Sequence, residues 1–223
     1  TEQTKIIYLN LYAGLLPAGA GKSHQSLRDI SLLSSIPNFK IYQPLNHKEV
    51  NEILKHCVLK EKNNCAIRLS IGPPPEEIYK IKKNLTFKDG KGFNLSNGKS
   101  VIIFAYGQYI MNEILRAKKI LEKKNIFPKI INMSSLNKFN VSWLKKTVIG
   151  YKHIFSIDDH NEVGGLGDNL LCELNRNDLL KDKSFYKIGV NNFPECGSSD
   201  EVLKYHKLDF KSLSQKIITK IIL

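Results

Sequence analysis

Short apolar runs alternate with amphipathic stretches along the whole chain, and this alternation constrains the fold more than any other feature of the sequence. Short runs bounded by turn residues are typical of buried strands, whereas apolar residues spaced three and four apart are typical of helices that pack on one face. Strands that alternate with helices favour right-handed crossovers and a mainly parallel sheet. The sequence therefore predicts a protein of the α/β class.

The predicted elements form two series. In the first third of the chain, the expected strands cover residues 6–11, 39–42 and 65–71, and the expected helices cover residues 26–34 and 47–59. In the second half, the expected strands cover residues 101–105, 128–133, 153–157 and 186–190, and the expected helices cover residues 111–124, 141–148, 168–174 and 211–222.

The alternation is interrupted after Gly72, where three consecutive prolines cannot continue a strand or a helix, because proline lacks a backbone N–H and fixes φ. The chain then stays polar and rich in Lys, Asn and Gly. We therefore expect a linker over residues 76–98, with room for a short hairpin. It would join a first unit of residues 1–75 to a second unit of residues 99–223, each a mainly parallel sheet with flanking helices.

The net charge of +13 is unusual for a chain of 223 residues. A basic face can attract nucleic acid, anionic lipid or phosphorylated metabolites. However, the lysines are spread along the chain and come with no RGG repeat, stacked aromatics or zinc-finger spacing, so we expect no nucleic-acid partner. The apolar runs are shorter than the roughly 18 residues of a membrane helix, and the first residues lack the layout of a secretion signal. We expect no membrane partner and a cytoplasmic location.

The four cysteines lack metal-ligand spacing, which favours reduced thiols. A zinc site built from distant cysteines and histidines is the alternative. The cysteines are Cys57, Cys65, Cys172 and Cys196.

Several blocks of the first unit resemble the transketolase family. Residues 21–26, Gly-Lys-Ser-His-Gln-Ser, are similar to its Gly-x-Thr-His-Gln block, and residues 36–38, Ile-Pro-Asn, are similar to its Ala-x-Pro-Asn entry to the next strand. Residues 43–46, Gln-Pro-Leu-Asn, resemble its x-Pro-Ala-Asp segment. Residues 65–69 look like the strand that closes its pyrimidine-binding domain.

The motifs of the second unit continue the match. Residues 105–107, Ala-Tyr-Gly, resemble the family's x-Thr-Gly-Ser strand end, and residues 159–161, Asp-His-Asn, resemble its Glu-x-His. Residues 164–167 match its Gly-Gly-Leu-Gly block, and residues 193–201 resemble its Phe-x-x-Ser-Gly-x-x-Asp-Glu. Each motif is weak alone, but their order and spacing identify the chain as a member of the transketolase family.

The resemblance implies a partial pyrimidine-binding domain over residues 1–75 and a transketolase C-terminal domain over residues 99–223. It also implies an enzyme that uses thiamine diphosphate and Mg²⁺ to transfer a two-carbon ketol unit between sugar or sugar-phosphate substrates. In such enzymes the cofactor attacks a carbonyl and holds the carbanion, while the protein orients the substrate and moves protons.

The family's pyrimidine-binding domain starts well before the His-Gln block, and an early helix there carries a catalytic Glu. A further domain holds the diphosphate and magnesium through a Gly-Asp-Gly motif. From the resemblance we expect either a homodimer or a complementary N-terminal subunit that carries the diphosphate-binding domain. We also expect the isolated chain to be inactive and to bind thiamine diphosphate with weaker than micromolar affinity.

Three residues form the candidate site. In the resembling enzymes the histidine at His24 faces the reacting carbon and the substrate hydroxyls, where a neutral imidazole can give and take protons. A loop histidine beside a helix start is the alternative. Gln25 and Lys22 are the candidate substrate-binding neighbours. Lys22 stands where the family has a small or polar residue, and a solvated lysine is its alternative.

Other polar residues are expected to be structural. The Gly164–Gly167 turn lacks a phosphate-loop pattern, and in the family it is a packing element. Asp158, Asp159 and His160 are adjacent on an extended segment and cannot easily converge on one ion, so we expect hydrogen bonds between the two units. Arg68 is expected to be structural, with a functional carboxylate pair as the alternative.

Three positions depart from the substrate contacts of ordinary transketolases. Aligned on His24, a second histidine, an aspartate and an arginine of the family fall on Tyr12, Ala20 and Ile71. A charge-assisted contact to phosphate is worth about 1.5–3 kcal/mol, and Ile71 cannot supply it. These departures predict an atypical substrate, such as an unphosphorylated, nucleotide-linked or shorter one.

Other functions stay open. A non-catalytic transketolase-like assembly or dimerisation module would keep the fold and the dimer surface without the chemistry. Deoxyxylulose-phosphate synthase and the beta subunit of 2-oxoacid dehydrogenases are related enzymes with the same resemblance.

Overall fold

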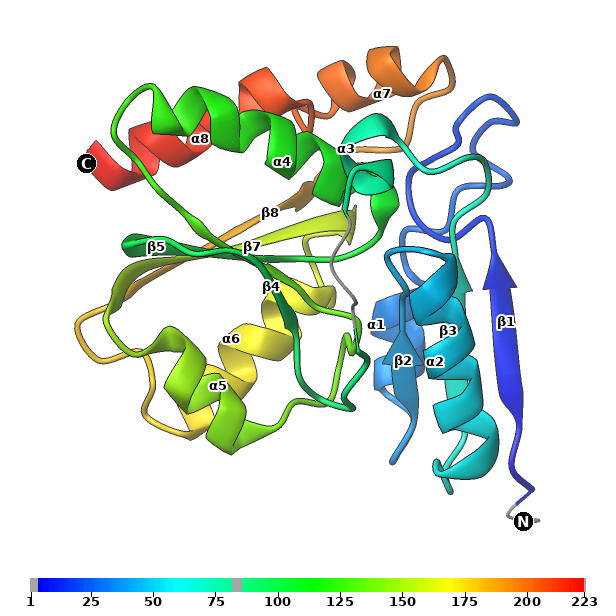
Figure 1. Ribbon diagram of the computed structural model, residues 1–223. Coiled ribbons are helices and arrows are strands. Elements are labelled where there is room, and N and C mark those ends of the chain that lie inside the picture. The colour runs from blue at the N-terminus through cyan, green and yellow to red at the C-terminus, as the bar shows by residue number, and fades with distance from the viewer. Residues whose placement is uncertain (1–3, 82–85, 223) are drawn as a thin grey trace.

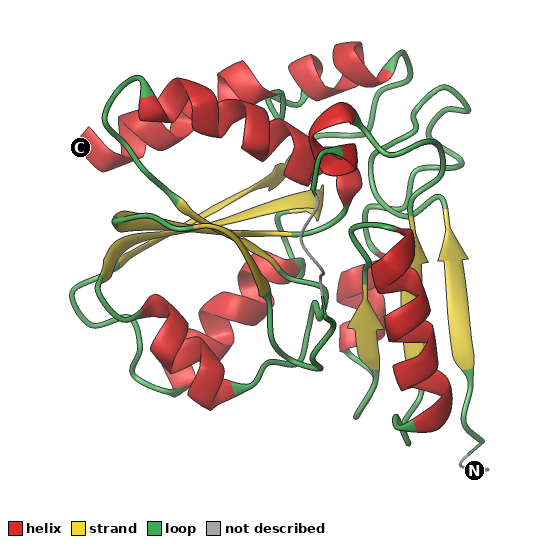
Figure 2. Ribbon diagram, in the orientation of Figure 1, coloured by secondary structure: helices red, strands yellow, loops and turns green. Residues whose placement is uncertain are grey.

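The computed structural model describes residues 4–81 and 86–222, and it contains two sheets with helices packed against them (Figures 1 and 2). A three-stranded sheet holds the first strands of the chain, and a five-stranded sheet holds the later ones. The predicted α/β class is confirmed. Among the described residues, no helix has both the length and the apolar character needed to cross a membrane.

The small sheet has the strand order β1-β3-β2, and both of its pairings are parallel. Helices α1 and α2 pack on opposite faces, because neighbouring residues of β2 and β3 alternate between two hydrophobic clusters. The elements are β1 (Ile7–Leu11), α1 (Asp29–Ser34), β2 (Lys40–Tyr42), α2 (His47–Leu59) and β3 (Cys65–Leu69).

Helix α2 shows how local chemistry sets these elements. Asn46 caps the helix, because its side chain accepts a hydrogen bond from the backbone N–H of Glu49 at 3.1 Å. Ile53 and Cys57, one turn apart, are fully buried in the cluster shared with β3. The observed bounds agree with the predicted ones.

The large sheet has the strand order β4-β6-β5-β7-β8. The β4–β6 pair is antiparallel and the other pairs are parallel. Helices α4 and α8 lie on one face and α5 and α6 on the other (Figure 1). The elements are β4 (Phe93–Ser96), β5 (Ser100–Ala105), α4 (Gln108–Glu122), β6 (Lys129–Asn132), α5 (Val141–Val148), β7 (Tyr151–Asn161), α6 (Leu166–Arg176), β8 (Ser184–Val190), α7 (Ser199–Tyr205) and α8 (Phe210–Ile222).

The segment predicted as a linker contains regular structure. Helix α3 (Glu76–Tyr79) opens it, and β4 forms the antiparallel edge of the large sheet. An edge strand pairs on one side only, so few apolar side chains suffice, and here Phe93 and Leu95 pack against the core. Where a short hairpin was expected, the described residues form a tight turn over residues 88–91, with Lys91 N–H donating to Lys88 O at 2.9 Å, and this bridge lies outside the named strands. Residues 82–85 lie outside the described residues.

The structure differs from the sequence prediction at two further places. Strand β7 continues through Asp158, Asp159 and His160 rather than ending before them, with an irregular register beyond Ile157. Helix α7 was not predicted, although Ser198 and Glu201 form a capping box at its start.

The two units share a hydrophobic core. Leu15, Leu16 and Leu27 of the loop after β1 are buried in the same cluster as Ile103 of β5 and Val190 of β8. The loop that carries the candidate site is therefore packed against the large sheet.

Candidate functional site

The loop between β1 and α1 carries the candidate residues to the junction of the two sheets. Gly14 N–H donates to Ser26 O at 3.0 Å, and Ser26 N–H donates to Gly14 O at 3.1 Å, which closes the loop. Gly14 has a φ of +90°, and a Cβ there would lie 2.1 Å from Oδ2 of Asp159 on β7. The loop therefore meets the large sheet at a point where only glycine fits.

Gln25 joins the two units through its side-chain amide. Its Nε2 donates to the backbone O of Leu15 at 3.1 Å and to the backbone O of Glu195 at 3.0 Å. Glu195 lies in the loop between β8 and α7. Gln25 Oε1 is buried and has no hydrogen-bond partner within the described ranges. The amide thus fixes the position of the loop at His24, its neighbour in sequence.

His24 is exposed at a shallow cleft of about 440 Å³ that Leu11, Tyr12 and Leu32 also line. Its Nδ1 lies 3.0 Å from Ser23 Oγ. Its ring meets the ring of Tyr12 edge-on, with the centroids 5.5 Å apart and the planes at 74°. These contacts limit the orientations of the imidazole, and its exposure leaves the ring accessible to a ligand.

Lys22 lines a second, larger cleft of about 800 Å³, together with Gln25, Phe193 and Tyr205. Its Nζ lies 3.5 Å from Oε1 of Glu195, and both side chains are exposed. An exposed ion pair of this kind is weak, so the Lys22 side chain can leave Glu195 and bind an anion in the cleft instead. The structure places His24 and Lys22 on different clefts, and Gln25 lines both.

Arg68 anchors the junction beneath the loop. It is fully buried on β3, and its Nε and Nη2 donate to Oδ2 and Oδ1 of Asp29 at 2.7 and 3.2 Å. Its Nη1 donates to Oε1 of Gln43 and, at 3.4 Å, to Oδ1 of Asp159. Burial opposes the charge, but Asp29 and Asp159 outweigh it and raise the pKa of Arg68. The expected structural role of Arg68 agrees with this geometry.

The acidic pair on β7 divides its contacts between the two units. Asp159 binds Arg68 of the first unit, whereas Asp158 accepts hydrogen bonds from Tyr106 Oη at 2.9 Å and from Leu166 N at 2.8 Å. Asp158 also accepts from the N–H of Gly167 at 3.1 Å, so it binds two buried backbone N–H groups at the start of α6. Burial raises the pKa of Asp158 to about 6. The prediction of contacts between the units therefore holds for Asp159 but not for Asp158.

His160 is fully buried beside this network. Its Nδ1 lies 2.8 Å from the backbone O of Asn161, and its Nε2 has no hydrogen-bond partner among the residues described. The nearest carboxylate oxygen is Oδ1 of Asp29, at 3.9 Å. Burial lowers the pKa of His160 to about 4, so the ring is neutral at pH 7.

The three positions that depart from the family are not equivalent. Tyr12 contacts His24 directly within the smaller cleft. Ala20 is exposed and Ile71 is half-buried, and neither lines either cleft. Tyr12 is therefore the departure that changes the surroundings of His24.

The smaller cleft does not offer ligands for a magnesium diphosphate. Asp29 is the carboxylate that lines it, and both of its oxygens accept hydrogen bonds from Arg68. Magnesium needs free oxygen ligands in near-octahedral geometry. The described residues around His24 therefore do not fit the metal and diphosphate part of the cofactor.

The two halves of the chain match two family descriptions. Residues 1–72 match the transketolase pyrimidine-binding domain, and residues 90–213 match the transketolase C-terminal domain. The chain belongs to the transketolase family. The motifs of the His-Gln loop, the glycine turn and the segment before α7 all lie within these matches.

Known proteins agree with this assignment. A Methanocaldococcus jannaschii protein described as a transketolase C-terminal section is 29% identical over 208 residues, which cover 93% of this chain and 63% of that protein. A 1-deoxy-D-xylulose-5-phosphate synthase from Caldanaerobacter subterraneus is 28% identical over 207 residues, which cover 90% of this chain and 31% of that protein. The chain thus spans less than two thirds of the length of either relative.

Solved structures show the same fold. A split-gene transketolase, solved as an inactive beta4 tetramer, superposes with a TM-score of 0.78 at 23% identity, covering 96% of this chain and 65% of that one. A transketolase mutant from Pichia stipitis gives a TM-score of 0.72 at 16% identity, covering 97% of this chain and 30% of that one.

Proposed function

We propose that the chain is the C-terminal portion of a thiamine-diphosphate-dependent, transketolase-like enzyme that transfers a two-carbon ketol unit between sugar-type substrates. The observation that carries this proposal is the His24–Gln25 pair. Gln25 bonds to both units, so the loop is rigid where His24 is exposed. The bound cofactor would supply the carbanion-stabilising chemistry, and His24 would hold or give the proton of a substrate hydroxyl.

The diphosphate and Mg²⁺ would be held by residues outside this cleft, in a complementary N-terminal subunit or in another part of a homodimer. Two observations support this part of the proposal. Asp29 is committed to Arg68 and is not free to bind a metal. The Methanocaldococcus jannaschii relative is itself described as a C-terminal section, and one structural neighbour comes from a split gene.

A deoxyxylulose-phosphate synthase is the second candidate. Several relatives that align with about nine tenths of this chain carry that name. The replacement of the family's second histidine by Tyr12 also favours a substrate other than those of ordinary transketolases. His24 would keep the same role in either enzyme.

The test is a reconstituted enzyme, in which the chain is combined with a transketolase N-terminal portion, thiamine diphosphate and Mg²⁺. Two activities are assayed: transfer from xylulose 5-phosphate to ribose 5-phosphate, and formation of 1-deoxy-D-xylulose 5-phosphate. We expect His24→Ala to lower kcat/KM by at least about a hundredfold, which is the usual contribution of a proton-transfer group. His47→Ala, an exposed histidine at the start of α2, is the matched control.

The outcomes separate the candidates. Weak transfer from xylulose 5-phosphate with strong synthesis of the deoxy sugar favours the second candidate. Turnover that His24→Ala leaves unchanged contradicts the assigned role of His24. A folded complex that turns over neither substrate set, nor their unphosphorylated analogues, supports the non-catalytic assembly module instead.

A further inference from the structure

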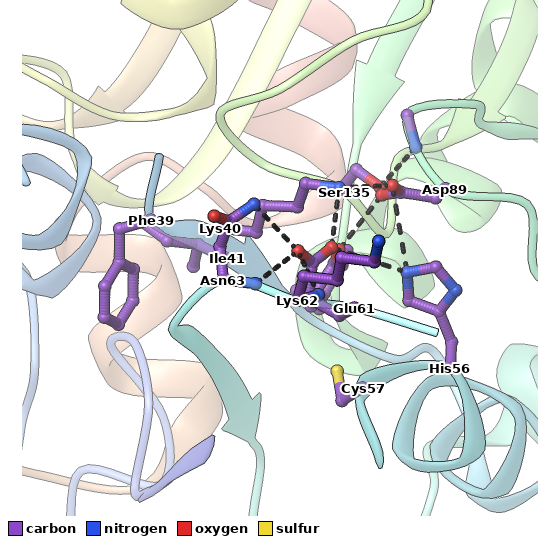
Figure 3. Close-up of polar contacts among 12 residues, drawn as sticks. Phe39, Lys40, Ile41, His56, Cys57, Glu61, Lys62, Asn63, Asp89 and Ser135 are labelled. Atoms are coloured by element: carbon purple, nitrogen blue, oxygen red, sulfur yellow. Dashed lines mark hydrogen bonds and ion pairs between the residues drawn. The ribbon is translucent and has the colours of Figure 1, made fainter. Parts of the chain in front are cut away.

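Away from the two clefts, four ionisable side chains meet beside β2. They are Lys40 on β2, His56 on α2, Glu61 in the turn after α2, and Asp89 in the turn before β4 (Figure 3). Lys40 Nζ lies 2.6 Å from Oε2 of Glu61 and 2.6 Å from Oδ2 of Asp89. Two carboxylates from separate segments thus point at one cation position.

Each carboxylate is held in place through its other oxygen. Oε1 of Glu61 accepts hydrogen bonds from the backbone N–H groups of Lys62 and Asn63, both at 2.9 Å, and from the Asn63 side chain at 3.1 Å. Oδ1 of Asp89 accepts from Tyr42 Oη at 3.0 Å. Carboxylates that bind metals are oriented in this way, with hydrogen bonds outside the coordination shell.

His56 supplies a nitrogen to the same position. Its Nε2 is buried, has no hydrogen-bond partner in residues 4–81 and 86–222, and lies 3.8 Å from each of the two carboxylate oxygens. The rings of Tyr42 and Phe87 pack edge-on against the imidazole, at centroid distances of 5.9 and 5.3 Å. The nitrogen is thus oriented toward two anionic oxygens that cannot donate to it.

We propose that His56, Glu61 and Asp89 form a binding site for a divalent ion of the Zn²⁺ type, which enters by displacing the Lys40 ammonium. The three ligand atoms lie within 4.8 Å of one another. Tetrahedral zinc with bonds of about 2.1 Å needs separations of about 3.4 Å, so a small closure completes the site. One imidazole nitrogen with two carboxylates suits Zn²⁺, whereas Mg²⁺ requires near-octahedral oxygen ligands.

The surroundings permit the exchange of cations. The Lys40 and Asp89 side chains are 23% and 30% exposed, so the ammonium can turn to solvent and a water molecule can fill the fourth position. The turn with Asp89 is fixed to the second unit, because Gly90 N–H donates to Ser135 Oγ at 2.9 Å. A bound ion would therefore connect α2 and the small sheet to the segment that enters the large sheet.

The competition between Lys40 and the metal provides the first test. Lys40→Met leaves the two carboxylates without a counterion, so we expect a lower Tm than that of the wild type in the presence of EDTA. Zn²⁺ should restore the Tm of this variant, and Mg²⁺ should not. The double variant Lys40→Met/His56→Gln should not recover with Zn²⁺, whereas Lys40→Met/His47→Gln should. Recovery that persists without His56, or no recovery in Lys40→Met, overturns the proposal.

Zinc titration against a chromophoric chelator provides a second test that does not depend on the stability of Lys40→Met. We expect His56→Gln to bind Zn²⁺ at least about tenfold more weakly than the wild type, and His47→Gln to bind like the wild type. If Lys40→Met folds, it should bind at least about tenfold more tightly. Equal zinc affinity of the wild type and His56→Gln, or no zinc binding by either, excludes the site.

Discussion

Arg68 brings a permanent charge into the most buried part of the junction, where Asp29 and Asp159 balance it. We expect Arg68→Met to lower the free energy of unfolding by about 3–5 kcal/mol, because it leaves the buried Asp159 and the largely buried Asp29 without their partner. Urea unfolding monitored by circular dichroism measures the loss. Lys80→Met removes an exposed pair with Glu76 and should change stability little. An equally small effect of Arg68→Met would mean that water enters the junction.

His160 makes the fold sensitive to acid. Its pKa is about 4 in the folded protein and 6.5 when the ring is free, so the unfolded chain binds the proton first as the pH falls. The free energy of unfolding should therefore fall by about 2 kcal/mol between pH 7 and pH 5 on account of this group. His160→Gln should remove that part of the pH dependence in urea titrations, while His24→Gln should retain it.

The raised pKa of Asp158 acts in the opposite direction. With a pKa of about 6 in the folded protein against 3.8 when free, the folded state takes up this proton first, so this group favours folding as the pH falls. Asp158 is present in the wild type and in His160→Gln. The difference between their slopes of unfolding free energy against pH therefore reports His160 alone. Identical slopes for the wild type and His160→Gln would show that Nε2 is hydrated.

The loop between β1 and α1 offers a matched pair of glycines. Gly14 has a φ of +90° and faces Asp159, whereas a Cβ at Gly19 would meet no atom within 4 Å. We expect Gly14→Ala to cost at least about 2 kcal/mol, because it combines backbone strain with a clash. Gly19→Ala should stay within about 0.5 kcal/mol of the wild type. Thermal unfolding compares the two, and similar Tm values would show that the loop can leave the large sheet.

At the scale of elements, the sequence predicted those helices and strands whose residues form a clear local pattern. The predicted bounds of helices α2 and α5 match the structure to the residue, and in the structure an asparagine side chain caps each helix, at Asn46 and Asn140. Strand β4 was missed because its apolar–polar alternation, Phe-Asn-Leu-Ser, covers four residues and lies within a segment that is otherwise polar. Helices α3 and α7 are each about a turn or two long and too short for a periodic signal.

The candidate site could be predicted only in part. The His24–Gln25 motif located the loop, since its resemblance to the family is a local feature. The contacts of Asp29, Gln43 and Tyr106 at the junction were not predicted, because their partners lie on distant segments and leave no local pattern. A buried arginine on a central strand was the available signal, since such a charge requires carboxylate partners nearby.

At the scale of the whole molecule, the two units are joined by contacts of different kinds. Apolar side chains of the loop after β1 lie in the core of the large sheet, Gln25 bonds to both units, and Arg68 binds Asp159. These contacts do not depend on the covalent connection between the units. The two units should therefore stay together when that connection is cut.

Limited proteolysis tests this prediction together with the proposed boundary. The Pro-rich segment after Gly72 is largely exposed, so we expect the first cleavage between Gly72 and Lys99, on the side that precedes the paired strand β4. The C-terminal piece should resist further digestion, and the two pieces should elute together in native size-exclusion chromatography and separate in urea. Scattered cleavage between Val101 and Leu174 would refute the boundary. Separation under native conditions would show that the shared core is too weak to hold the His24 loop against the large sheet. The loop would then lack the rigidity on which the proposed role of His24 depends.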